Sequence, residues 1–326
     1  MPMDQASALY NQAVIFHNSN HLPEAIELYH QALSLDPHFP EALSNLGTIY
    51  QNQGRLQEAQ QLYQTALTHH PHFYPARNNL GALLRDLGDF SGAIDQYTAS
   101  LNDHPDNPDA YNNLGVALQN LNRLPKAIQA YQNAIRLNSS AINPYINLGS
   151  VLQEIGDSES AVTAYQQALE IDPDSITALS HLVHQLQQTC QWSLVEQHKI
   201  HLITLVKRQI AQHLPAQLDP LISIAMINDP LFNMQVAKSW SQAILRRVSA
   251  LRPNFHFSHL SHSTPLHIGY LNDFRDAPVF QLISGLFSAH DRRRFKISAF
   301  SFGPGPNSRN RDIVKKTSTA FSTSAV

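Results

Sequence analysis

The chain has 326 residues, of which 43% are hydrophobic and 14% are charged, a composition typical of folded proteins and unlike that of disordered ones. Its single cysteine, Cys190, excludes an internal disulfide framework and a thiolate-rich metal site, and we expect a buried, small apolar residue there. No apolar stretch is long enough to cross a bilayer, and residues 1–10 lack the pattern of a signal peptide. We therefore expect a cytoplasmic protein with no membrane partner.

The net charge of −3 is distributed unevenly along the chain. Residues 1–173 contain 6 basic and 17 acidic residues, a net charge of −11, whereas residues 174–326 contain 16 basic and 8 acidic residues, a net charge of +8. The acidic segment repels nucleic acid, so no nucleic-acid partner is expected. The basic segment could attract phosphate-bearing ligands or acidic surfaces, although an ordinary solvated face is the simpler interpretation.

A tyrosine recurs every 34 residues without slippage, which predicts a stack of helix-turn-helix units. The five tyrosines are Tyr29, Tyr63, Tyr97, Tyr131 and Tyr165. An alanine precedes each of them by four residues, and a Leu-Gly pair recurs at the same interval from Leu46-Gly47 to Leu148-Gly149. The small residues let two helices approach closely, while the tyrosine ring fills the gap toward the next unit. Prolines, which cannot donate a helical hydrogen bond, end most of the second helices.

This pattern resembles the tetratricopeptide repeat, which has Leu-Gly early in its first helix, Ala early in its second helix and Pro at its end. The resemblance covers residues 6–173 and implies five repeats in a right-handed α-solenoid, so the fold class is mostly α. Repeat one has Gln12-Ala13 at the Leu-Gly position, which suits a terminal unit with no preceding neighbour.

The sixth position of the repeat is asparagine in all five copies. These residues are Asn11, Asn45, Asn79, Asn113 and Asn147. The first helices of such repeats line the concave surface, and an asparagine amide matches the hydrogen-bonding groups of an extended peptide backbone. We therefore predict that the five asparagines bind extended polypeptide segments of other proteins. The alternative is that each asparagine bonds only within its own repeat, since Asn readily makes local hydrogen bonds.

Residues 174–217 are predicted to form a degenerate sixth repeat with capping helices, in which Leu182 falls near the leucine position. Residues 218–264 are predicted as a helical segment and linker, with helices around 219–228 and 231–250 whose apolar residues are explained by packing. The linker contains three histidines, but a Ser-rich, aperiodic run lacks the fixed geometry of a metal site, so no metal is expected. They are His256, His259 and His262.

From residue 265 the pattern changes to an apolar run at 266–271, a helical stretch at 279–290 and a second apolar run at 295–302. This order predicts an incomplete Rossmann-like β-α-β segment with parallel strands. Several short sequences resemble the O-GlcNAc transferase and SPINDLY family. They are Ile268-Gly269-Tyr270, Asp273-Phe274-Arg275, Gly285-Leu286-Phe287, His290-Asp291-Arg292 and Ser301-Phe302-Gly303-Pro304, and, just after the repeats, Leu182-Val183-His184-Gln185 and Cys190-Gln191-Trp192.

The resemblance implies that residues 265–326 are the N-terminal fragment of a catalytic domain. Members of the family move GlcNAc, or fucose in the SPINDLY branch, from a nucleotide sugar to Ser or Thr of proteins without a metal. Their repeats carry a comparable asparagine ladder that holds protein substrates by the backbone. In this chain the active-site histidine of the family pattern is replaced by Ala277, which cannot accept a proton or bind a hydroxyl.

We therefore predict a protein-binding scaffold related to protein O-GlcNAc transferases, with no catalytic residue, no cofactor and no transferase activity of its own. The alternative is a protein O-GlcNAc or O-fucosyl transferase that is completed by a longer gene product or by another chain. The Ser/Thr-rich ending after Lys316 stands where a strand and a helix would be expected, which favours a truncated or disrupted gene product.

Overall fold

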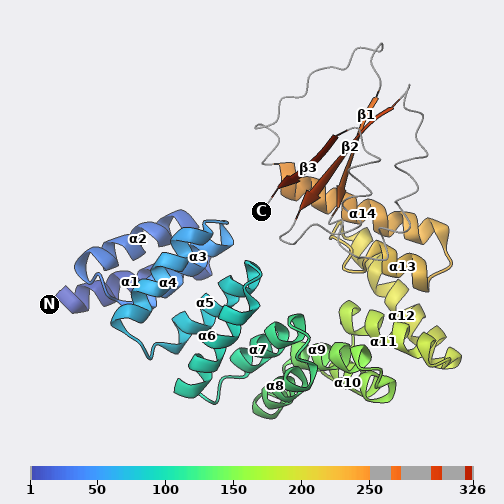
Figure 1. Cartoon of the computed structure of the whole chain (residues 1–326), viewed down its shortest axis with the longest axis horizontal. Helices are drawn as coiled ribbons and strands as arrows, with labels where there is room; N and C mark the ends of the chain where they lie inside the picture. Colours follow the sequence, from blue (N-terminus) through green and yellow to red (C-terminus); the bar gives the residue numbers. More distant parts are fainter. Residues whose placement is uncertain (1, 250–265, 273–294, 303–319, 325–326) are drawn as a thin grey trace. The chain divides into compact units, whose positions relative to one another are not determined.

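The computed structural model describes residues 2–249, 266–272, 295–302 and 320–324 (Figure 1). It consists of two compact units, Met1–Val248 and Ser249–Val326. Ten helices of the first unit form five pairs, one for each predicted repeat. They are α1 (Pro2–Asn18), α2 (Leu22–Leu35), α3 (Pro40–Asn52), α4 (Leu56–His69), α5 (Tyr74–Asp86), α6 (Phe90–Asp103), α7 (Pro108–Asn120), α8 (Leu124–Leu137), α9 (Ile142–Glu154) and α10 (Ser158–Ile171).

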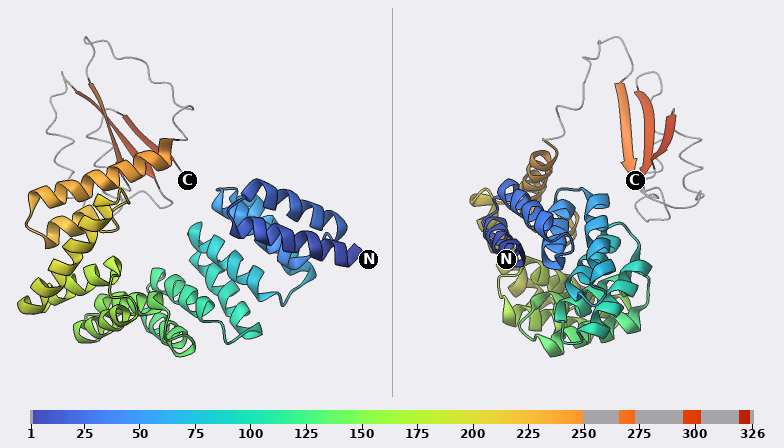
Figure 2. Two further views of the ribbon diagram at one scale, coloured as in Figure 1. Left: turned by 180° about the vertical axis from the view of Figure 1, so that it is seen from behind. Right: turned by 90° about the vertical axis from the view of Figure 1, so that its left-hand side faces the viewer.

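The pairs stack in chain order, as both views in Figure 2 show. Each first helix packs mainly on the second helix of its own repeat, and the second helix packs on the next repeat. The first helices of successive repeats also touch, as α3 and α5 do. The side chains of the five repeat tyrosines are fully buried, as is the alanine four residues before each of them. This arrangement confirms the steric roles that the 34-residue period predicts.

The Leu-Gly glycines lie directly against the tyrosine rings of their own repeats. A Cβ atom added at Gly81 would lie 2.7 Å from Cε1 of Tyr97, and one added at Gly115 would lie 2.5 Å from Cε1 of Tyr131. Real Cβ atoms essentially never come this close to another heavy atom. The glycine is therefore required because the ring occupies the space that any side chain would take.

The second residue after the end of each first helix adopts a left-handed conformation in all six helical pairs that the structure describes. These residues are Asn20, Gly54, Gly88, Asn122, Gly156 and Cys190, with φ between 56° and 84°. Gly and Asn adopt this conformation more readily than other residues. Cys190 is exposed, so the expectation of a buried cysteine is wrong. Its position follows from the turn between two helices, which lies at the surface.

Two further helices, α11 (Ile176–Gln188) and α12 (Trp192–Ala211), form a sixth pair, in which Leu182 is fully buried. This pair shares one hydrophobic core with repeat five and with the two helices that follow, α13 (Pro220–Met226) and α14 (Pro230–Ser249). Val236 of α14 is buried, but Leu231 and Met234 are 70% and 59% exposed. Packing therefore does not explain all the apolar residues of α14, contrary to the prediction.

No helix in the described part of the chain is both long enough and apolar enough to cross a membrane.

The described residues of the second unit form a parallel three-stranded sheet in the order β1-β2-β3. Strands β1 (Leu266–Asn272) and β2 (Phe295–Phe302) coincide with the two predicted apolar runs, whereas β3 (Ala320–Ser324) lies within the Ser/Thr-rich ending. Strand β3 pairs in parallel with β2. The helix predicted at 279–290, Ala277 and the three linker histidines lie outside the described residues.

Candidate functional site

The five predicted asparagines lie on the first helices of the five repeats. Asn11 on α1 is exposed, and the other four, on α3, α5, α7 and α9, are partly buried. The side-chain amides of three of them donate hydrogen bonds to the preceding repeat. The bonds run from Asn45 Nδ2 to Tyr10 Oη (3.2 Å), from Asn79 Nδ2 to Ser44 Oγ (3.0 Å) and Thr48 Oγ1 (3.3 Å), and from Asn147 Nδ2 to Asn112 Oδ1 (2.9 Å).

We call these five asparagines the asparagine ladder. In each of the three linked repeats, the asparagine bonds to the residue 35 positions earlier, which is one residue more than the repeat length. The ladder therefore ties neighbouring repeats together. Bonding within a single repeat, the alternative raised from the sequence, is not what these amides do. Among the described residues, none donates a hydrogen bond to Oδ1 of Asn79 or of Asn147, so both oxygens remain available as acceptors.

A second row of contacts joins the repeat tyrosines to glutamines of the first helices. The tyrosine hydroxyls donate to a glutamine twelve residues earlier in three repeats, namely Tyr63 to Gln51 (3.1 Å), Tyr131 to Gln119 (2.9 Å) and Tyr165 to Gln153 (3.3 Å). Gln51 then donates to Asp86 of the next repeat at 3.1 Å, and Gln119 donates likewise to Glu154. Burial raises the pKa of Tyr63 to about 12, so its hydroxyl keeps the proton that it donates.

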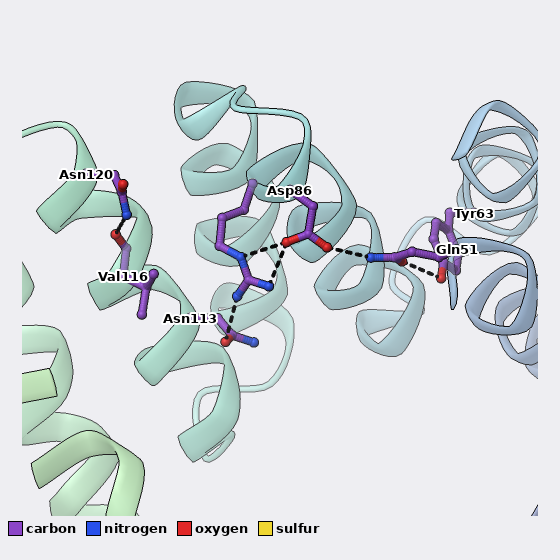
Figure 3. A network of polar contacts seen from close by, with 7 residues as sticks. Gln51, Tyr63, Asp86, Asn113, Val116 and Asn120 are labelled. Atoms are coloured by element: carbon purple, nitrogen blue, oxygen red, sulfur yellow. Dashed lines mark hydrogen bonds and ion pairs between the residues drawn. The ribbon is translucent and has the colours of Figure 1, made fainter. Parts of the chain in front are cut away.

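Repeat three interrupts the row of tyrosine–glutamine contacts, and Figure 3 shows the contacts around this interruption. Arg85 stands at the glutamine position and has only donors to offer. Its Nη2 donates to Oδ1 of Asp86 at 3.0 Å, and its Nη1 donates to Oδ1 of Asn113 at 3.4 Å. The hydroxyl of Tyr97 and Oδ1 of Asn78 are buried without a hydrogen-bond partner among the described residues.

The sixth helical pair continues the asparagine ladder with a different residue. His181 on α11 lies 34 residues after Asn147 and so occupies the ladder position. Its ring stacks on the ring of Tyr165, with 5.3 Å between centroids and 12° between planes. Burial, with a smaller effect of His184, lowers the pKa of His181. His181 is not among the site residues predicted from the sequence, although counting one more period from Asn147 finds it.

The described residues contain no group of three or more His, Cys, Asp or Glu side chains that could hold a metal ion. Their polar groups along the first helices are mainly amides and hydroxyls, which bind by hydrogen bonds.

Models of the tetratricopeptide repeat match residues 19–84, 52–96, 78–142 and 142–175. The chain thus contains tetratricopeptide repeats, as the spacing of the tyrosines predicts. Repeats of this class stack into solenoids that present extended binding surfaces. The first unit therefore has the fold of a protein-binding scaffold.

Over 148 residues the chain is 28% identical to the Arabidopsis thaliana protein named "Probable UDP-N-acetylglucosamine--peptide N-acetylglucosaminyltransferase SEC". The match covers 43% of this chain and 15% of that protein, so the chain spans a small part of its relative. Among solved structures, PilF of Pseudomonas aeruginosa has a TM-score of 0.58 at 17% identity, covering 63% of this chain and 94% of that one. Cut9 with Hcn1, from an APC/C hetero-tetramer, has a TM-score of 0.55 at 17% identity, covering 72% and 43%. These two likenesses show a shared fold alone.

Proposed function

We propose that this protein is a scaffold that holds extended polypeptide segments of other proteins along the asparagine ladder. The observation that carries the proposal is the hydrogen bonding of the ladder amides. Bonds to the preceding repeat orient the amides of Asn79 and Asn147, while their Oδ1 atoms accept no hydrogen bond from the described residues. Acceptors fixed before binding lose little freedom when a ligand arrives.

An extended polypeptide supplies the groups that such a row of acceptors needs. Every residue of its backbone except proline carries one N–H donor, whatever its side chain. A ladder that accepts from backbone donors therefore binds many sequences. This property suits a scaffold that has to take several partners.

The proposal is tested by separating the two tasks of the ladder, which are to link repeats and to bind peptide. The double variant Asn79→Ala with Asn113→Ala removes two amides. The matched control, Ser44→Ala with Thr48→Ala, removes the partners of the Asn79 amide but keeps the amide itself. Binding is measured on the full chain by fluorescence anisotropy of short labelled peptides rich in Ser and Thr. Circular dichroism reports whether the helices remain.

We expect the asparagine variant to bind about tenfold more weakly, because each lost hydrogen bond contributes roughly 1 kcal/mol. The control should lose less affinity than the asparagine variant, because it keeps the amide and removes only the bonds that orient it. Equal losses in both variants would mean that the amides act only by linking repeats. Unchanged binding in the asparagine variant would remove the ladder from the binding site.

A second candidate function is a protein O-GlcNAc or O-fucosyl transferase. In this proposal residues 6–173 are the five repeats, 174–217 a degenerate sixth repeat with capping helices, 218–264 a helical segment and linker, and 265–326 the start of a catalytic domain. The parallel pairing of β1 with β2 favours it, since a β-α-β unit requires parallel strands. The name of the Arabidopsis relative supports GlcNAc as the sugar.

Sugar transfer separates the two candidates. The full chain is incubated with radiolabelled UDP-GlcNAc or GDP-fucose and with Ser/Thr-rich peptides. The scaffold proposal expects incorporation no higher than in a blank without protein. Incorporation above that blank would instead establish a transferase.

A further inference from the structure

A cavity of about 530 Å³ lies at the C-terminal end of the asparagine ladder, between α9, α11 and α13. One side is polar and includes Glu154 of α9 with His181 and His184 of α11. The other side is apolar and includes Leu221 and Ile222 of α13. All of these residues belong to the first compact unit.

The cavity lies in register with the ladder. His181 is at the asparagine position of the sixth helical pair, and Gln153, another lining residue, is at the glutamine position of repeat five. A polypeptide lying along the ladder would therefore reach this cavity. At this position the asparagine amide of the ladder is replaced by the imidazole of His181, which stacks on Tyr165 and lines the cavity.

The apolar side chains that line the cavity are more exposed to solvent than apolar side chains usually are. Leu221 is 75% exposed and Ile222 is 38% exposed. Covering such side chains with an apolar group is favourable, because it removes apolar surface from water. A volume of about 530 Å³ is large enough for an aromatic or branched aliphatic side chain.

The charge beside the cavity favours a cationic neighbour. Glu154 is exposed, and residues 1–173 carry a net charge of −11. An acidic surface attracts basic segments and repels acidic ones. The occupant that fits both features is an extended segment with a large apolar residue next to Lys or Arg.

We propose that this cavity binds a large apolar side chain of the polypeptide held by the ladder, with an adjacent Lys or Arg paired to Glu154. The inference rests on the proposed scaffold function and adds sequence preference to it. The ladder binds backbone and tolerates many sequences, whereas the cavity selects one position of the ligand.

Three labelled peptides test the preference. They share a Ser/Gly/Thr sequence and differ at two adjacent central residues, which are Phe-Lys, Ala-Lys or Phe-Glu. Anisotropy is measured with the full chain. We expect the Phe-Lys peptide to bind about tenfold or more tightly than the Ala-Lys peptide, from burial of the ring. The Phe-Glu peptide should also bind more weakly, and Glu154→Gln should reduce the difference between Lys and Glu.

Variants of α13 locate the effect in the cavity. Ala225→Trp fills the space, and it should weaken the Phe-Lys peptide about tenfold while leaving the Ala-Lys peptide unchanged. Ile224→Trp is the matched control, since Ile224 lies on the same helix, is 62% exposed and does not line the cavity. Leu221→Ser, at an exposed position, is a second variant with the same expected direction. Circular dichroism confirms folding in each case.

The outcomes separate this inference from the scaffold proposal. If all three peptides bind equally and lose affinity with Asn79→Ala and Asn113→Ala, the cavity preference is overturned and the scaffold proposal stands. If Ala225→Trp and Ile224→Trp act alike, the cavity is not the site. If sedimentation shows a dimer that Ala225→Trp abolishes, a second copy of the chain covers the cavity, and the inference fails.

Discussion

The hydroxyl of Tyr97 lies buried near Arg85 without a hydrogen-bond partner among the described residues, while the equivalent hydroxyl of Tyr131 donates to Gln119 at 2.9 Å. The two repeats differ at the residue that should accept this bond. A guanidinium has five donors and no acceptor, so Arg85 cannot replace the glutamine. Repeat three therefore carries a local energetic cost that its neighbours do not.

Removing the two hydroxyls should have different effects on stability. Tyr131→Phe should lower the free energy of unfolding by about 1 kcal/mol, because Gln119 loses the donor to its Oε1. Tyr97→Phe should leave it unchanged or raise it, because the lost hydroxyl has no partner. Urea unfolding of both variants of the full chain measures the difference. Equal losses would contradict the assigned bonding.

Replacing Arg85 by glutamine should repair repeat three. Arg85→Gln supplies the acceptor that Tyr97 lacks, and we expect a gain of about 1 kcal/mol in the free energy of unfolding. Arg85→Lys is the control, since a lysine ammonium also has no acceptor. Both variants lose the bond to Asn113. A gain in the lysine variant as large as in the glutamine variant would show that the acceptor is not the cause.

The contact between Gly115 and Tyr131 should not tolerate a methyl group. Gly115→Ala should lower the free energy of unfolding by about 2 kcal/mol, because the new Cβ would lie 2.5 Å from Cε1 of Tyr131. Combining it with Tyr131→Leu removes the atom that it strikes. The double variant should therefore be more stable than the sum of the two single effects predicts. Strict additivity in chemical unfolding would exclude this contact as the cause.

The turn at Cys190 should improve with glycine. Cys190 has φ of 57°, a conformation in which a Cβ atom costs about 1 kcal/mol and glycine costs nothing. Cys190→Gly should therefore raise the midpoint of thermal unfolding. Cys190→Ala keeps a Cβ atom and should show no gain. A gain shared by both variants would point to the thiol and not to the backbone.

Acidification should weaken the end of the solenoid through His181. Burial, and to a smaller extent His184, lowers the pKa of His181 in the folded protein. Below the ordinary histidine value of about 6.5, the unfolded chain therefore binds the proton first, and stability falls as the pH falls toward the lowered value. His181→Asn should make unfolding free energies between pH 7 and pH 5 less dependent on pH. An unchanged slope would contradict the prediction.

The repeats and their helices could be predicted because the same packing requirements recur in each repeat. A ring that fills a gap and a glycine that makes room for it leave the same pattern every 34 residues, as with Tyr131 and Gly115. The burial of Cys190 was mispredicted from the usual behaviour of cysteine, whereas its place in the period assigns it to the turn. His181 could also have been found by counting.

Other features depend on contacts that the 34-residue sequence pattern does not reveal. The amide of Asn79 bonds to Ser44 and Thr48, and polar residues at those positions do not reveal which group they meet. Helix α13 forms one side of the cavity beside His181, but a helix of seven residues outside the repeats gives no register from which to place it. Tertiary contacts alone determine both arrangements.

These hydrogen bonds of the ladder each join the same two positions of two neighbouring repeats. Removing one whole repeat of 34 residues therefore leaves the two repeats on either side able to form the same bond. Deleting residues 74–107 would bring Asn113 to Ser44 and Thr48, the groups that Asn79 meets now. The same deletion would discard Arg85 and Tyr97 together. The number of repeats, and with it the length of the asparagine ladder, is thus free to vary in whole steps.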